Sequence, residues 1–132
     1  MGEAALQADL QAVRQAVAER TRMEEALEAT RRDVNLRIHK EYRGVTEGVL
    51  KIRALEQALK SNEQLLDSTL KSVRAGVRSQ LDVLNAEQQL ATASRDLIQA
   101  RYSYLMSRLR LYSLSGEDPL AAVEEINAAF AP

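Results

Sequence analysis

The sequence predicts an all-α protein built as a long antiparallel coiled-coil hairpin, and three observations support this prediction. The 132 residues include only two prolines, so long stretches are free of the residue that most strongly breaks helices. Apolar residues recur at the seven-residue spacing of a coiled coil through most of the chain. Four Tyr, one Phe and no Trp favour long Leu- and Ala-rich interfaces over a compact core of large rings.

The first predicted helix covers about residues 4–73, a segment without proline. Its main apolar stripe follows the heptad through Leu10, Val17, Ile38, Val45, Ile52, Leu59, Leu66 and Val73. A weaker stripe of Ala and Leu lies on the opposite side. We expect one continuous helix with weak points at Gly44 and Gly48, because each glycine costs about 1 kcal/mol relative to alanine. The alternative is a break there that gives two helices.

A sharp turn is predicted at residues 74–79, where the heptad pattern stops. Gly76 can adopt the left-handed backbone conformation that ends a helix. Ser79 and Asp82 have the spacing of a capping box that starts the next helix. These residues form the tip of the predicted hairpin.

The second predicted helix covers about residues 80–114 and has two apolar seams on nearly opposite sides. One seam runs through Leu84, Ala91, Ile98, Leu105 and Tyr112. The other runs through Val83, Leu90, Leu97, Tyr104 and Leu111. A two-stranded coiled coil needs only one seam. A helix with two buried stripes and two polar faces between them is typical of a stave in a wall or barrel.

Gly116 ends this helix, and Asp118 followed by Pro119 begins a short helix at about residues 119–130 that carries Phe130. The arms of the hairpin are unequal. A return helix ending near residue 114 reaches back only to about residue 40, so we expect the apolar stripes of residues 4–39 to need another partner.

Catalysis, metal binding and cofactor binding find no support in the pattern. The only histidine, His39, lies on a wholly polar stripe and is interpreted as a solvated side chain. The sequence has no cysteine, no Gly-rich phosphate loop and no metal-ligand spacing. Lys and Arg are interspersed with Asp and Glu, which argues against nucleic acid as a partner. We therefore predict no enzyme, no cofactor and no metal.

No stretch approaches the roughly 20 apolar residues of a membrane-spanning helix. The N-terminus lacks the basic start and apolar run of a signal peptide. The chain itself is expected not to span a membrane.

The two polar faces of the second helix differ in composition. One face carries Asp82, Asn85, Gln89, Thr92, Asp96, Gln99 and Ser103. The other carries Glu87, Ser94, Arg101 and Arg108. If the helix is a stave, one face lines an aqueous channel, and carboxylates and amides near the tip would select and gate what passes. The simpler alternative is that Asp82 only caps the helix and Asn85 is solvated.

The sequence also resembles a known family. The tip region reads Ala75-Gly76-Val77-Arg78-Ser79-Gln80-Leu81-Asp82-Val83-Leu84-Asn85-Ala86. This run and the helix after it, most clearly over residues 76–112, are similar to the last periplasmic hairpin of the TolC family of outer-membrane efflux and type I secretion channels. The segment before the tip, with Glu41-Tyr42, Ala54-Leu55-Glu56 and Leu66 to Thr69, resembles the preceding helix of that family.

The resemblance implies one periplasmic hairpin domain at residues 1–132, with a tip at 74–79 and an equatorial tail at 115–132. It implies a homotrimeric channel in a Gram-negative outer membrane, whose periplasmic helices form a barrel that closes at its tip. The implied pore constriction consists of Arg78, Asp82 and Asn85. Asn85 stands where the family has a second acidic residue, and Val73 stands where some members have a tyrosine.

The resemblance also implies partners, namely a periplasmic adaptor protein and an inner-membrane transporter. The implied adaptor contact consists of Gly76, Val77 and Ser79, although the family commonly has threonine at the position of Val77. A full channel of this kind has β-strands and a signal peptide, so the chain is expected to be an excised helical part that can self-associate.

Two other interpretations remain open at this point. A free-standing cytosolic coiled-coil scaffold would use both seams to recruit partner helices. An adaptor hairpin of the same export machinery is a third possibility. It is disfavoured because adaptor proteins flank their hairpin with β-rich domains and lack the run that this chain has from Leu81 to Ala86.

Overall fold

The computed structural model describes residues 2–130 and, within the last helix, the side chains up to residue 128. It contains three helices, α1 (Gly2–Arg74), α2 (Gln80–Ser115) and α3 (Pro119–Phe130), and no strand within the described residues. The all-α prediction is confirmed, with helix ends within two residues of those expected. The predicted contribution of the Phe130 side chain lies outside the described side chains. The described residues fall into two units, one ending at Ile38 and one beginning at His39.

Helix α1 is continuous through Gly44 and Gly48, so the predicted continuous helix is confirmed and the break is excluded. In the first unit, every side chain from residue 2 through residue 33 is exposed. These exposed residues include large apolar side chains at Leu6, Leu10, Val13, Val17, Met23 and Leu27. The two stripes read from the sequence are therefore uncovered in this unit.

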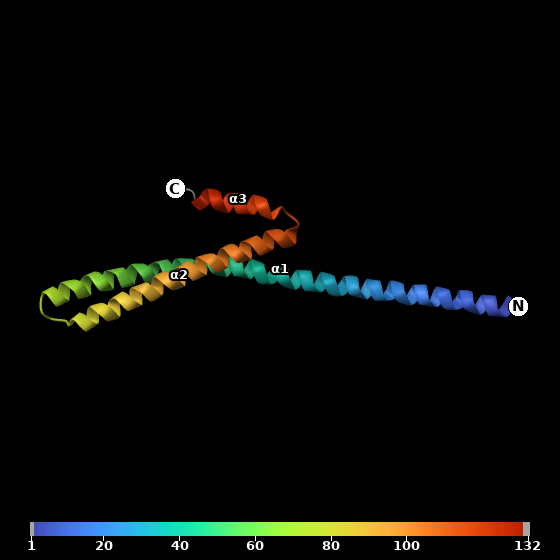
Figure 1. The fold of residues 1–132 in the computed structure, drawn as a ribbon, viewed down its shortest axis with the longest axis horizontal. Helices are drawn as coiled ribbons and strands as arrows, with labels where there is room; N and C mark the ends of the chain where they lie inside the picture. The colour runs from blue at the N-terminus through green and yellow to red at the C-terminus, as the bar shows by residue number, and fades with distance from the viewer. Residues whose placement is uncertain (1, 131–132) are drawn as a thin grey trace. The chain divides into compact units, whose positions relative to one another are not determined.

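In the second unit, α2 runs antiparallel to the last half of α1 and packs along it (Figure 1). One of the two predicted seams of α2 makes this interface, with buried side chains at Val83, Ala86, Ala93, Leu97 and Ala100. Four of these five are small or β-branched, and this permits close packing of the two helices. The hairpin is confirmed as the arrangement of α1 and α2.

The other seam of α2 stays exposed, although it is just as apolar. Leu84 is 59% exposed, and Leu81, Ile98 and Tyr102 are exposed to a similar extent. A row of exposed large apolar side chains along one helix marks a surface made for contact with another protein element. The sequence predicts neighbours for both seams of α2, and within the described residues α1 covers one of them.

Gly44 and Gly48 let α2 approach α1 closely. A methyl group placed on Gly44 would lie 2.5 Å from Ser107 Oγ, and one placed on Gly48 would lie 3.2 Å from a ring carbon of Tyr104. Both distances are shorter than ordinary van der Waals contacts. The sequence marks these glycines as weak points, whereas in the structure they form a notch that receives α2.

Helix α3 begins as its sequence predicts and packs against the end of α2. The Asp118 carboxylate accepts a hydrogen bond of 3.0 Å from the backbone N–H of Leu120, so it caps a helix whose first residue is Pro119. Ala122 is buried, and Glu125 forms an ion pair of 3.1 Å with Arg108 of α2. These contacts hold α3 on the side of α2 that carries Arg108.

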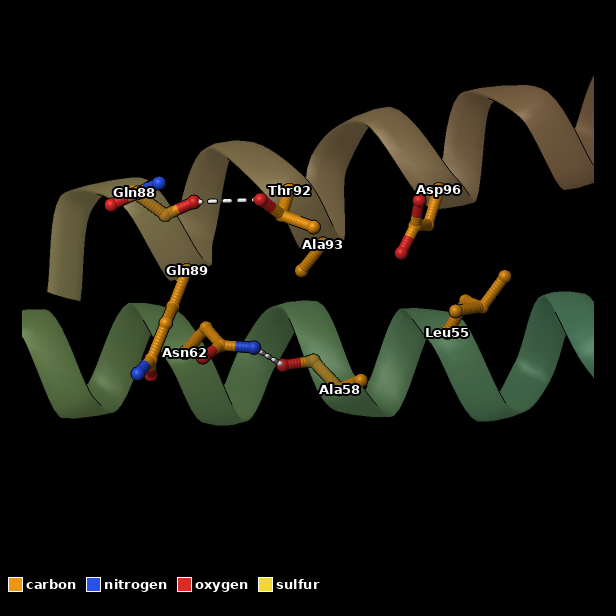
Figure 2. A pocket seen from close by; sticks show the side chains of 8 residues that line it. All are labelled: Leu55, Ala58, Asn62, Gln88, Gln89, Thr92, Ala93 and Asp96. Carbon is orange, nitrogen blue, oxygen red and sulfur yellow. Dashed lines mark hydrogen bonds between the residues drawn. The ribbon is translucent and has the colours of Figure 1, made fainter. Parts of the chain in front are cut away.

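A groove of about 500 Å³ lies between α1 and α2 on one face of the hairpin (Figure 2). Helix α1 contributes Leu55, Ala58 and Asn62, and α2 contributes Gln88, Gln89, Thr92, Ala93 and Asp96. Two of the polar groups are satisfied within their own helices, because Asn62 Nδ2 donates to the Ala58 carbonyl and the Thr92 hydroxyl donates to the Gln88 carbonyl. The remaining amide and carboxylate groups give this groove a polar wall.

Candidate functional site

The candidate functional site is the hairpin tip, where α1 ends in a Schellman motif. The N–H of Val77 donates to the Ser72 carbonyl over 3.0 Å, and the N–H of Gly76 donates to the Val73 carbonyl over 2.9 Å. Gly76 has φ of 77°, the left-handed conformation predicted from the sequence. The last carbonyls of α1 are therefore satisfied inside the turn itself.

The start of α2 is fixed by a capping box between Ser79 and Asp82, as predicted. Asp82 Oδ2 accepts hydrogen bonds from the Ser79 backbone N–H at 2.9 Å and from the Ser79 hydroxyl at 3.1 Å. These hydrogen bonds to Ser79 lower the pKa of Asp82 below the ordinary aspartate value, and the nearby Arg78 charge adds to the effect. Asp82 is therefore held as a carboxylate, half-buried beside the turn.

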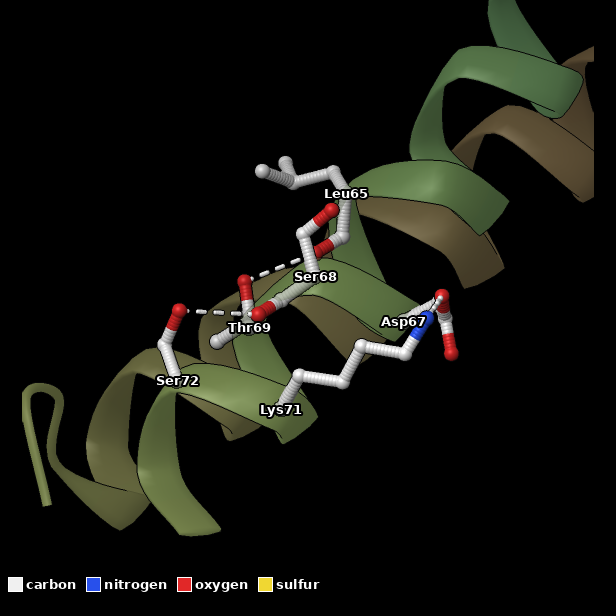
Figure 3. Close-up of polar contacts among 6 residues, drawn as sticks. All are labelled: Leu65, Asp67, Ser68, Thr69, Lys71 and Ser72. Atoms are coloured by element: carbon white, nitrogen blue, oxygen red, sulfur yellow. Dashed lines mark hydrogen bonds and ion pairs between the residues drawn. The ribbon is translucent and has the colours of Figure 1, made fainter. Parts of the chain in front are cut away.

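Arg78 reaches back across the turn to the end of α1. Its Nη1 atom lies 3.4 Å from the hydroxyl of Thr69, which is 1% exposed. Thr69 in turn donates a hydrogen bond of 2.7 Å to the Leu65 carbonyl (Figure 3). On the same stretch, Ser72 bonds the Ser68 carbonyl and Lys71 pairs with Asp67. The hairpin thus supplies its own partner for Arg78.

Among the large apolar side chains that the structure describes, Val77 is the most exposed, with 78% of its surface accessible. In many Schellman motifs the corresponding residue packs back on the helix that it follows. Val77 does not, and its side chain projects from the turn. Gly76 and Ser79 are exposed on either side of it, so the three predicted contact residues form one small surface.

Asn85 lies one helical turn above Asp82 on the same face of α2 and is exposed. The tip thus brings Arg78, Asp82 and Asn85 to adjacent turns of one hairpin. Asp82 supplies the one carboxylate among these three residues. Asn85 adds an amide that can donate and accept hydrogen bonds.

Two ion pairs join the arms of the hairpin above the tip. Arg101 Nη2 lies 2.8 Å from Glu56 Oε1, and Arg110 Nη1 lies 3.7 Å from Glu41 Oε1. The first pair is half-exposed, so it contributes little to stability. Glu41 is buried and its long ion pair closes the hairpin at the end far from the tip.

Arg108 joins α2 to α3 through contacts with two partners. It pairs with Glu125 and lies 5.8 Å from the ring centroid of Tyr112, within the range of a cation–π contact. Tyr112, followed by the Glu125 charge, raises the pKa of Arg108 above its ordinary value. The contacts with Tyr112 and Glu125 therefore favour the charged form of Arg108.

Sequence reasoning missed two features of the site. Thr69 is the most deeply buried side chain near the tip, yet a threonine on a helix gives no signal of burial. The notch at Gly44 and Gly48 was visible as two glycines four residues apart, and this spacing on one helical face is a signal of close helix packing.

Within residues 2–130, no cluster of His, Asp or Glu could hold a metal ion. In the same range, none of the helices has the length and apolarity needed to cross a membrane. The chemistry available at the tip is charge and hydrogen bonding combined with exposed apolar side chains at Val77 and Leu81.

The chain is similar to known proteins of three bacteria over most of its length. The alkaline protease secretion protein AprF of Pseudomonas aeruginosa is 36% identical over 121 residues, which cover 92% of this chain and 25% of AprF. The proteases secretion protein PrtF of Dickeya chrysanthemi is 32% identical over 104 residues, 79% of this chain and 22% of PrtF. The outer membrane protein TolC of Escherichia coli is 32% identical over 92 residues, 70% of this chain and 19% of TolC.

The chain thus spans about a quarter or less of the length of these relatives. Residues 7–117 match the sequence model of the outer membrane efflux protein family, a range that includes both arms of the hairpin and the whole tip. This protein belongs to the outer membrane efflux protein family.

Proposed function

We propose that this chain is the periplasmic hairpin part of a trimeric outer-membrane channel that serves efflux or type I protein secretion and has no enzymatic activity. The observation that carries the proposal is the two-sided hairpin. It buries one seam of α2 against α1 and leaves an equally apolar seam exposed between two polar faces. A hairpin of this kind suits a stave with neighbours on its flanks and water on its inner and outer surfaces.

The family match supports this proposal over a free-standing cytosolic scaffold. The names of the relatives support secretion in particular, because AprF and PrtF are both named for the secretion of proteases. On this basis the longer protein is an outer-membrane protein, and the hairpin is its periplasmic portion.

The tip acts in two ways in this proposal. Arg78, Asp82 and Asn85 form the constriction that opens and closes the pore. Gly76, Val77 and Ser79 meet a periplasmic adaptor protein, which links the channel to an inner-membrane transporter. The exposed Val77 supports the second assignment, because it lies in the turn, whereas this proposal assigns the apolar seams of the arms to sideways contacts with neighbouring helices.

Planar-bilayer recording of the full-length protein tests the proposal. Sequencing the gene on both sides of this segment gives the coding sequence from which the full-length protein is produced. It also shows whether strand-forming segments and a signal peptide flank the hairpin. We expect discrete single-channel events and a trimer by native mass spectrometry. A purified full-length protein that is monomeric and does not conduct would overturn the proposal.

A further inference from the structure

The two polar faces of the hairpin are used differently. The face with Arg101 and Arg108 is occupied by protein groups, because Arg101 pairs with Glu56 and Arg108 pairs with Glu125 of α3. The opposite face carries Asp82 near the tip, and its one described ion pair between the arms, Arg110 with Glu41, lies at the end far from the tip. No described ion pair crosses this face between Asp82 and Asp96. Helix α3 therefore covers the Arg108 side of α2, which leaves the opposite face as the candidate for lining a pore.

Asp96 is the second carboxylate on the face of Asp82. It lines both the groove of about 500 Å³ shown in Figure 2 and a neighbouring cavity of about 330 Å³. Lys51 of α1 lines the second cavity as well, together with Gln99 and Ser103. Among the described residues no ion pair joins Asp96 to Lys51 or to any other cation, so the two charges face the same space unpaired.

Resting on the proposed channel function, we propose that Asp96 and Lys51 form a second charge-selective station inside the pore, separate from the constriction at the tip. Asp96 follows Asp82 by two heptads, which is about 21 Å along a helix. The Debye length at physiological ionic strength is about 8 Å, so the charge of Asp82 is largely screened at this height. Three copies of Asp96 attract cations at a level where the tip has little influence, and the three copies of Lys51 moderate this attraction.

The test measures the ratio of cation to anion permeability of the full-length protein in planar bilayers under a salt gradient. Asp96→Asn lowers this ratio by a factor of about 2 to 3, and Lys51→Gln raises it. Glu56→Gln and Arg101→Gln change the charge on the opposite face by the same amounts and leave the ratio unchanged. Equal ratios for the Asp96 variant and the wild type would overturn the proposal.

Cysteine labelling gives a second measurement that does not depend on the carboxylate. This segment has no cysteine of its own, so in a full-length protein from which any other cysteine has been replaced, each single substitution reports on one position. Thr92→Cys and Ser103→Cys, which flank Asp96 on its face, lose conductance when a charged thiol reagent is added to the open channel. Ser94→Cys on the opposite face keeps its conductance. Block at Ser94 but not at Thr92 or Ser103 would reverse the assignment of the faces.

The outcomes separate this inference from the proposed function. A wild-type protein that does not conduct contradicts the channel itself. A conducting, cation-preferring protein that responds to Asp82→Asn and not to Asp96→Asn keeps the channel and overturns only the second station.

Discussion

The guanidinium of Arg78 lies 3.4 Å from the hydroxyl of Thr69, which places a residue of the turn against the helix that precedes it. This distance is long for a hydrogen bond, and Arg78 is exposed. Thr69 is buried and already bonded to the Leu65 carbonyl. Arg78 is therefore guided by its own hairpin but remains able to change partners.

Arg78→Ala in the full-length protein should raise single-channel conductance, because the side chain that stabilises the closed tip is lost. Thr69→Val keeps the shape of residue 69 and removes only its hydroxyl. If Arg78 acts through partners in neighbouring subunits, the Thr69 variant conducts like the wild type. Unchanged conductance in Arg78→Ala would return Arg78 to the role of a solvated turn residue.

Acid should loosen the start of α2. The folded-state pKa of Asp82 is lowered, so its hydrogen bonds to Ser79 stabilise the tip fully above the ordinary aspartate pKa of about 3.9 and are lost as pH falls through the lower folded value. The amide proton shift of Ser79, followed by NMR, should titrate with a midpoint below the ordinary aspartate pKa. Asp82→Asn abolishes the titration, and Asp96→Asn preserves it. A midpoint above the ordinary value would contradict the capping assignment.

Gly44→Val should destabilise the hairpin by about 1–3 kcal/mol, because the added side chain meets Ser107 where a methyl group alone would lie 2.5 Å from the hydroxyl. Ala54→Val adds a branched side chain at an exposed position of the same helix and should cost less than about 0.5 kcal/mol. Thermal unfolding followed by circular dichroism at one fixed protein concentration compares the two. Equal melting temperatures would show that α2 can move away from the notch without cost.

Val77→Asp should leave the hairpin folded and reduce export by the complete machinery. Val77 is 78% exposed, so its replacement removes no packing, but it places a charge on the surface assigned to the adaptor. Circular dichroism checks folding, and secretion assays check export. Crosslinks from residues 76–79 should capture the adaptor. Normal export, with crosslinks only to neighbouring subunits, would leave the turn as a simple connection.

The 132-residue chain should self-associate in solution, because the large apolar residues between Leu6 and Leu27 are exposed. Light scattering should show a mass that rises with concentration while circular dichroism shows a helical protein. Leu10→Glu combined with Val17→Glu shifts the chain toward the monomer. Gln11→Glu adds charge on the polar stripe and leaves the association unchanged. A compact monomer at all concentrations would contradict this prediction.

The hairpin could be predicted from the sequence because local signals and long-range patterns agree. Gly76 and Ser79 mark the turn, and the heptads on both sides require the arms to pair. The partner of Arg78 could not be predicted, because it depends on the rotation of α1 about its axis at Thr69. For the same reason the sequence indicates Gly44 only as a weak point of α1. Its role in the structure is to leave room for Ser107 of α2.

The site was predictable only in part. The positions of Arg78, Asp82 and Asn85 on adjacent turns follow from their spacing, and their roles in a pore stay predictions. Asp96 was visible on the polar face of α2. Its two cavities need residues of α1, such as Lys51 and Asn62, whose register against α2 a single sequence does not reveal.

The notch at Gly44 and Gly48 and the turn at Gly76 together fix the register and the relative lengths of the two arms. Gly48 and its neighbour Tyr104 each stand 28 positions from Gly76, which is four heptads along either arm. An insertion in one arm alone, between Gly48 and Gly76 or between Gly76 and Tyr104, would carry Tyr104 away from Gly48. Length changes are therefore tolerated when both arms gain or lose the same number of heptads. Relatives with longer or shorter hairpins should differ by a multiple of seven residues in one arm and by the same number in the other.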